Sequence, residues 1–131
     1  MSLIVPNTGK QKMLEYMLGV DTSVENVVLR LYTNDATPTV NSIHTDFTAL
    51  AAGTGYSEIT LTPSSWTITS GSATYPQQTW TFTGSVGNIY GYYASTATSN
   101  ELLMAERFNG APFNIASNGD AINVTLGITV S

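Results

Sequence analysis

The sequence contains no cysteine, so disulfide bonds and thiolate metal ligands are excluded. Charge is also scarce, because Asp, Glu, Lys and Arg together make up 10% of the 131 residues and only four residues are Lys or Arg. With a net charge of −5, the chain lacks the basic patch that nucleic-acid binding requires, and no basic amphipathic segment indicates a membrane surface. We therefore expect neither nucleic acid nor membrane among its partners.

Long apolar runs are missing as well. Near the start, the apolar run Leu3-Ile4-Val5 ends at Pro6, and Lys10 and Lys12 follow it. A secretory signal has the opposite order and a longer apolar stretch, and no segment is long and apolar enough for a transmembrane helix. We therefore expect the protein to be made in the cytoplasm.

Residue types that carry chemistry are few and scattered. His44 is the only histidine and lies close to Asp46, and one histidine beside one carboxylate is a weak signal for zinc. The sequence also lacks the ligand spacing of a calcium loop, a glycine-rich phosphate loop and a nucleophile elbow. We expect no metal, no cofactor and no enzymatic activity.

The N-terminal part predicts an extended arm over residues 1–7 and a helix over residues 8–19. Thr8 can cap the helix, with Gln11 three residues on, and Gly19 can end it. Four apolar residues recur at helical spacing and are expected to face the core. They are Met13, Leu14, Met17 and Leu18.

From about residue 26 to residue 131, apolar residues alternate with period two and turn signals separate short segments. The expected strands lie within residues 27–32, 56–62, 65–70, 77–84, 88–95, 101–108 and 121–130. This pattern is typical of an all-β, two-sheet sandwich or jelly roll, here as one domain. Residues 34–55 lack periodicity and predict a long loop that binds something or wraps a neighbouring molecule.

Two adjacent charges, Glu106 and Arg107, interrupt an apolar strand, and Arg30 interrupts another. Neighbours on a strand point to opposite faces, so Glu106 and Arg107 cannot easily pair with each other. We predict that Glu106 meets Arg30 or a subunit contact and that Arg107 lies at an interface or rim. Alternatively, Glu106 is a catalytic acid, which for glycoside hydrolysis requires a second carboxylate about 5–9 Å away; Glu58 and Glu101 are the candidates.

Aromatic residues raise a second alternative, a carbohydrate-binding module. A sugar-stacking platform would draw on Tyr90, Tyr92, Tyr93, Trp66 and Trp80. Strand alternation splits this group between two faces, and Trp80 has the pattern of a core residue.

Several phrases in fixed order resemble a family of small structural proteins of tailed bacteriophages. The phrases are LRLYTND (29–35), IYGYY (89–93), LLMAERF (102–108) and NGDAINVT (118–125), and the resemblance covers most of residues 1–131. It implies a virion component with a β-sandwich core and no enzymatic activity, and it transfers no catalytic residue. The implied role is a capsid decoration (cement) protein or a tail-associated part.

We therefore expect a virion protein that binds the phage major capsid protein, or another virion protein, as a homo-oligomer. A trimer is favoured, because shell proteins meet at three-fold points. The arm of Leu3, Ile4 and Val5 is expected to add a strand to a neighbour's sheet edge. The alternative within this class is a tail, neck or fibre-adaptor protein.

Overall fold

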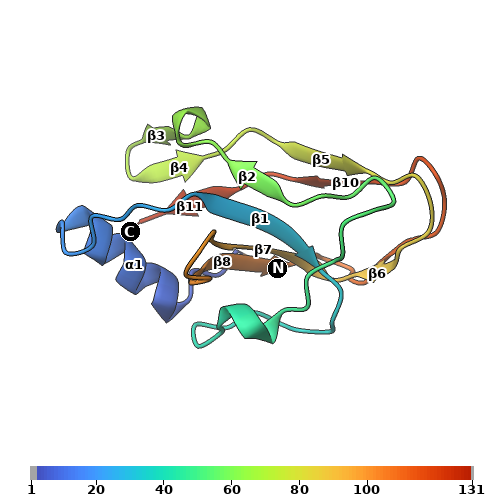
Figure 1. Cartoon of the computed structure of the whole chain (residues 1–131), viewed down its shortest axis with the longest axis horizontal. Helices are drawn as coiled ribbons and strands as arrows, with labels where there is room; N and C mark the ends of the chain where they lie inside the picture. The colour runs from blue at the N-terminus through green and yellow to red at the C-terminus, as the bar shows by residue number, and fades with distance from the viewer. Residues whose placement is uncertain (1–2, 131) are drawn as a thin grey trace.

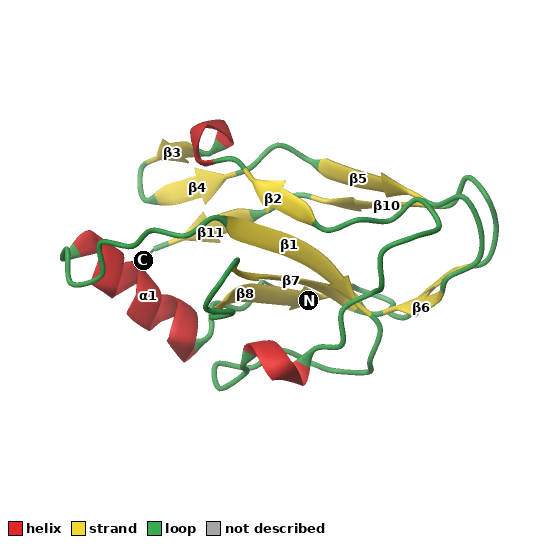
Figure 2. Cartoon of the chain, viewed as in Figure 1, coloured by secondary structure: helices red, strands yellow, loops and turns green. Residues whose placement is uncertain are grey.

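Strands dominate the structure, a computed structural model that describes residues 3–130 (Figures 1 and 2). The elements, in chain order, are α1 (Asn7–Met17), β1 (Val27–Tyr32), the 3-10 helix η1 (His44–Asp46), β2 (Ile59–Leu61), the 3-10 helix η2 (Pro63–Ser65), β3 (Thr67–Thr69), β4 (Ser72–Thr74), β5 (Gln78–Thr81), β6 (Gly87–Ile89), β7 (Gly91–Thr96), β8 (Leu102–Arg107), β9 (Phe113–Ile115), β10 (Ala121–Val124) and β11 (Gly127–Thr129).

The strands form a sandwich-like arrangement, which confirms the predicted all-β class (Figure 1). One layer is an antiparallel sheet in the order β2-β1-β7-β8. The other layer contains the sheet β11-β4-β3 and the pair β10-β5, and the pair β6-β9 lies at one end. The strand expected over residues 121–130 is divided into β10 and β11, which pair with different strands.

Period-two alternation explains the core between the layers. Five alternating residues of the last segment were expected on one face. Ile122, Val124 and Leu126 are buried as predicted and join the apolar cluster of Leu29 and Leu31 of β1, whereas Ile128 is only partly buried and Val130 is 74% exposed. Full burial of a large apolar side chain contributes roughly 1.5–3 kcal/mol, so this cluster is the main stabilising feature of the fold.

Strand β7 is buried along its whole length, because the first sheet is covered on both faces. The outer cover comes from residues 33–50, where Phe47 packs on the rings of Tyr32 (4.8 Å) and Tyr93 (5.2 Å). Figure 2 shows the short helix η1 within this largely irregular segment. The loop was expected to contact another molecule, but its buried aromatic side chain packs on the chain's own sheet.

Strand β8 has a bulge at Leu103, opposite the step from Ala94 to Ser95 of β7, and this bulge changes which residues of β8 share a face. Leu102 lies opposite Ser95 and joins the outer cluster, while Leu103 joins the main core. Simple alternation instead predicts that Leu102 shares a face with Met104 and that Leu103 points to the opposite face. A bulge adds one residue to a strand and so moves the side chains beyond it to the other face.

Helix α1 forms nearly where expected, and Gly19, with φ +71°, follows its end as predicted. The predicted orientation of the helix is wrong. Leu14, Met17 and Leu18 are 53%, 72% and 69% exposed, whereas Gly9 and Lys12 are buried.

Contact with β8 explains this orientation. A Cβ atom on Gly9 would lie 2.4 Å from the carbonyl oxygen of Leu103, so only glycine allows this approach. The hydroxyl of Thr8, expected to cap the helix, instead donates a hydrogen bond to the Leu102 carbonyl (2.7 Å). Pro6 occupies the N-cap position.

The arm, of which the structure describes Leu3 to Val5, lies along the free edge of β8. Ile4 exchanges two backbone hydrogen bonds with Ala105 (2.8 and 3.0 Å), and Leu3 packs against the main core. The arm therefore covers an edge of its own sheet, where a neighbour's edge was expected. A contact of Leu3, Ile4 or Val5 with another chain stays a prediction.

We predict that Gly9→Ala lowers the free energy of unfolding, although alanine favours helix formation by about 1 kcal/mol over glycine. The added Cβ meets backbone atoms of β8, which cannot move aside as a flexible side chain would. Overpacking of this kind costs about 1–3 kcal/mol. Urea unfolding measures the difference, and Gly127→Ala is the control, because no atom lies within 4 Å of a Cβ at that position. A Gly9→Ala protein as stable as the wild type contradicts the close contact.

Candidate functional site

The predicted pair of Arg30 and Glu106 does not form. Arg30 lies opposite Tyr93, and Glu106 lies opposite Tyr92, on the strand β7 that separates them. Because adjacent residues of a strand point to opposite faces, the two charged side chains leave opposite faces of the sheet. The partner prediction was wrong because strand order and register, which sequence does not give, decide it.

Arg30 pairs with Glu58 instead. Its Nε lies 2.6 Å from the Glu58 carboxylate, and its Nη1 donates to the Ser95 hydroxyl (3.0 Å). The arginine is largely buried, but Glu58 is about half exposed, so water screens the pair. Such pairs contribute about 0–1 kcal/mol, and the bond to Ser95 ties β1 to β7 as well.

Glu106 serves as the hydrogen-bond acceptor for a buried tyrosine. The hydroxyl of Tyr92, a core residue, donates to the Glu106 carboxylate at 2.5 Å. Burial, and then this hydrogen bond, raise the pKa of Tyr92 well above its ordinary value. A buried hydroxyl without a partner is costly, so the carboxylate has a structural role in the sheet.

Neither candidate for a second catalytic carboxylate joins Glu106. Glu58 is held by Arg30 on the other face of the sheet. Glu101 lies five residues earlier in the chain, which is roughly 15 Å in an extended segment, and it pairs with Lys12. The residues named for acid catalysis therefore do not come together.

Arg107 connects β8 to residues 33–50, which we call the covering loop. Its Nη1 contacts the carboxylate of Asp35 (2.6 Å) and the carbonyl of Ala36 (3.2 Å), and its guanidinium lies over the ring of Tyr90 (5.2 Å). Asp35 itself is exposed, so this cluster lies at the surface of the domain. A role of Arg107 in an interface stays a prediction.

The lone histidine contacts an aromatic ring. His44 lies edge-on to Tyr93 with ring centroids 5.6 Å apart, and burial and the charge of Arg30 lower the pKa of His44. Within residues 3–130, no three His, Asp or Glu side chains are grouped so as to hold a metal ion. That the protein needs no metal stays a prediction.

Most of the aromatic residues considered for a sugar platform are in the interior. Tyr92, Tyr93 and Trp80 are buried, while Tyr90 and Trp66 are only partly exposed. They therefore do not form the exposed platform that sugar stacking requires.

Sequence reasoning missed a buried charge cluster. Lys12 is only 6% exposed, and its Nζ lies 2.8–2.9 Å from carboxylate oxygens of Glu15, Asp21 and Glu101. Asp21 first, then the other two carboxylates, raise the pKa of Lys12. The pKa of Asp21 is lowered chiefly by Lys12, and that of Glu15 by Gln11 and then Lys12. Four neighbouring charges on different elements thus fix α1, the turn after it and the start of β8.

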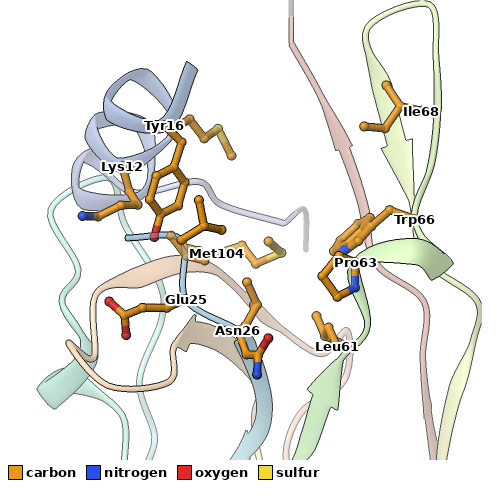
Figure 3. A pocket seen from close by; sticks show the side chains of 13 residues that line it. Lys12, Tyr16, Glu25, Asn26, Leu61, Pro63, Trp66, Ile68 and Met104 are labelled. Atoms are coloured by element: carbon orange, nitrogen blue, oxygen red, sulfur yellow. The ribbon is translucent and has the colours of Figure 1, made fainter. Parts of the chain in front are cut away.

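A groove of about 310 Å³ lies between α1 and the β2–β3 region. Its lining is mostly apolar, and in Figure 3 Tyr16 lies on the helix side while Trp66 and Ile68 lie across from it. The lining includes Met13, Tyr16, Val24, Leu61, Trp66 and Ile68. We call this feature the groove.

One polar atom in the groove has no partner. The hydroxyl oxygen of Tyr16 is buried and forms no hydrogen bond within the described part of the chain. An unpaired buried hydroxyl lowers the free energy of unfolding by about 1–3 kcal/mol, so Tyr16 makes this part of the fold less stable than a paired hydroxyl would.

Beside the groove, the outward face of α1 forms an apolar ridge of Leu14, Met17 and Leu18. Met17 follows the groove residue Met13 by one helical turn, so ridge and groove adjoin. Val24 and Ile68, in the groove, are also more than 70% exposed. Single exposed apolar residues are common, but a continuous apolar surface marks an interaction site. Sequence reasoning found the ridge residues but assigned them to the core.

Comparisons of the chain with protein-family models, with curated proteins and with solved structures find no match. None of the described helices has the length and apolar character of a membrane span.

We expect the Lys12 cluster to make stability depend on acid. Because the pKa values of Glu15 and Asp21 are lowered in the fold, their contribution is present above the ordinary carboxyl pKa of about 4 and is lost as pH falls through the lowered values. Lys12→Met should lower the melting temperature at neutral pH and flatten its decrease in acid. Lys10→Met, at an exposed position of the same helix, is the control. Equal acid profiles for wild type and Lys12→Met would contradict the prediction.

Two substitutions of Glu106 show whether the structure needs its hydrogen-bond acceptor or its negative charge. Glu106→Gln keeps a carbonyl oxygen for the Tyr92 hydroxyl, whereas Glu106→Ala removes the acceptor and should cost about 1–3 kcal/mol. We expect Glu106→Gln to be clearly more stable than Glu106→Ala in urea unfolding. If both variants lose the same stability, the negative charge matters and the acceptor role is wrong.

Proposed function

We propose that the protein is a non-enzymatic structural component of a phage virion that decorates the capsid shell as a homo-oligomer. The observation that carries the homo-oligomer in this proposal is the apolar surface of ridge and groove, which the described residues leave uncovered. An exposed surface of this kind is a binding surface for another macromolecule.

The distribution of charge supports attachment by packing. Arg30, Lys12 and Arg107 all pair with carboxylates of the same chain. Three of the four cations are therefore already held within the chain and do not have to leave water as free charges when another protein surface covers them. Apolar burial then supplies the binding energy.

The resemblance to phage structural proteins supports the assignment to a virion. Its phrases fall mainly on β1, β7 and β8, the strands of the doubly covered sheet. The resemblance therefore supports the same kind of sheet and a place in the virion. It implies a capsid or a tail position alike, and of these two we propose the capsid.

Co-sedimentation with capsids that lack this protein tests the proposal. We expect purified protein to sediment with such capsids up to a fixed ratio per shell and to stay in the supernatant without them. Added tails or tail tubes provide the matched comparison, because the alternative role is in the tail, neck or fibre adaptor. Binding to tails but not to shells contradicts decoration and supports that alternative, and binding to neither contradicts both.

A further inference from the structure

We propose that a second copy of this chain covers the apolar surface, with the ridge of each copy seated in the groove of the other about a two-fold axis. The inference rests on the homo-oligomer in the proposed function, and it replaces the trimer expected from the sequence with a two-fold dimer through a named surface. The groove of one copy therefore binds Leu14, Met17 and Leu18 from helix α1 of the other copy.

Shape is the first argument. The ridge projects from α1, and the groove lies directly beside it, between the helix and the wall of Trp66 and Ile68 (Figure 3). A projecting and a hollow feature on the same face are complementary to a second copy of that face turned by half a rotation. This is the isologous contact of two-fold dimers, the commonest form of soluble oligomer.

Extent is the second argument. The ridge residues and the rim residues Val24 and Ile68 are each more than half exposed, and Val20, beyond the helix, is 76% exposed. A standard interface takes ~800 Å² from each partner, and exposed apolar side chains of this size and number supply a large part of that area. A small ligand would cover the groove and leave the ridge in water.

Charge opposes this contact and sets a cost that apolar burial has to exceed. Glu15, Asp21 and Glu101 share the single cation Lys12. Glu25, which lines the groove, accepts hydrogen bonds from the amides of Thr98 and Ser99 and keeps its negative charge. These groups comprise one positive and four negative charges beside the apolar surface, and like charges on two copies repel each other.

Light scattering coupled to gel filtration measures the mass of the full chain. We expect twice the 14.0 kDa of one chain at micromolar concentration. Met17→Glu on the ridge and Ile68→Glu on the groove wall should each give the mass of one chain. Val40→Glu is the matched control, because Val40 is also about half exposed but lies in the covering loop, where its carbonyl contacts Asn7 near the other end of α1. Circular dichroism and thermal unfolding confirm that each variant folds.

Tryptophan emission gives a second measurement that needs no variant. Trp66 lines the groove, whereas Trp80 is buried in the core. Dilution of the wild type through the dissociation range should shift the emission to longer wavelength, and Trp66→Phe should abolish the shift.

Three results would overturn the inference. They are a monomeric wild type at all concentrations, an equal loss of mass in the Val40→Glu control, and an assembly of any size that the ridge and groove variants leave intact. Capsid binding is a separate test. A dimer that ignores capsids refutes the decoration role and leaves this contact in place, whereas a monomer that binds capsids does the reverse.

Discussion

The contact between Gly9 of α1 and the Leu103 carbonyl of β8 is the constraint on which the outer parts of the structure depend. Because no side chain separates the two backbones, the glycine face of the helix must point inward. Lys12 follows Gly9 by three residues and is therefore carried into the interior, where it requires carboxylate partners. The same rotation turns the ridge outward. One missing side chain thus accounts for the buried lysine and for the exposed apolar face.

The strands could be predicted from sequence because burial along a strand is a local pattern. Ile122 and Val124 alternate with exposed residues, and the structure buries them accordingly. The helix face could not be predicted in the same way, since the apolar-stripe rule assumes packing through large side chains. The partner of Glu106 could not be predicted from the sequence either. It depends on β7 lying between β1 and β8, and on a register in which a shift by one residue reverses every face.

Three of the few cations in the chain have structural roles. Arg30 joins β1 to β7 through Ser95, Arg107 fixes the covering loop, and Lys12 fixes the helix. Each cation connects elements that are distant in sequence and that apolar packing alone leaves free to slide.

Energetics decides between a contact through the ridge alone and one that uses ridge and groove together. Docking α1 through Gly9 leaves Leu14, Met17 and Leu18 in water, and burying each fully is worth roughly 1.5–3 kcal/mol. They are already partly covered, so the ridge alone supplies about 3–6 kcal/mol on the same scale. Association costs an estimated 4–15 kcal/mol in lost freedom of motion, which the ridge barely offsets. A two-fold contact makes every ridge-to-groove interaction twice, which doubles this contribution to about 6–12 kcal/mol before the groove walls are added. It therefore lies well within the range of the association cost, whereas a single docked ridge reaches only the lower end of that range.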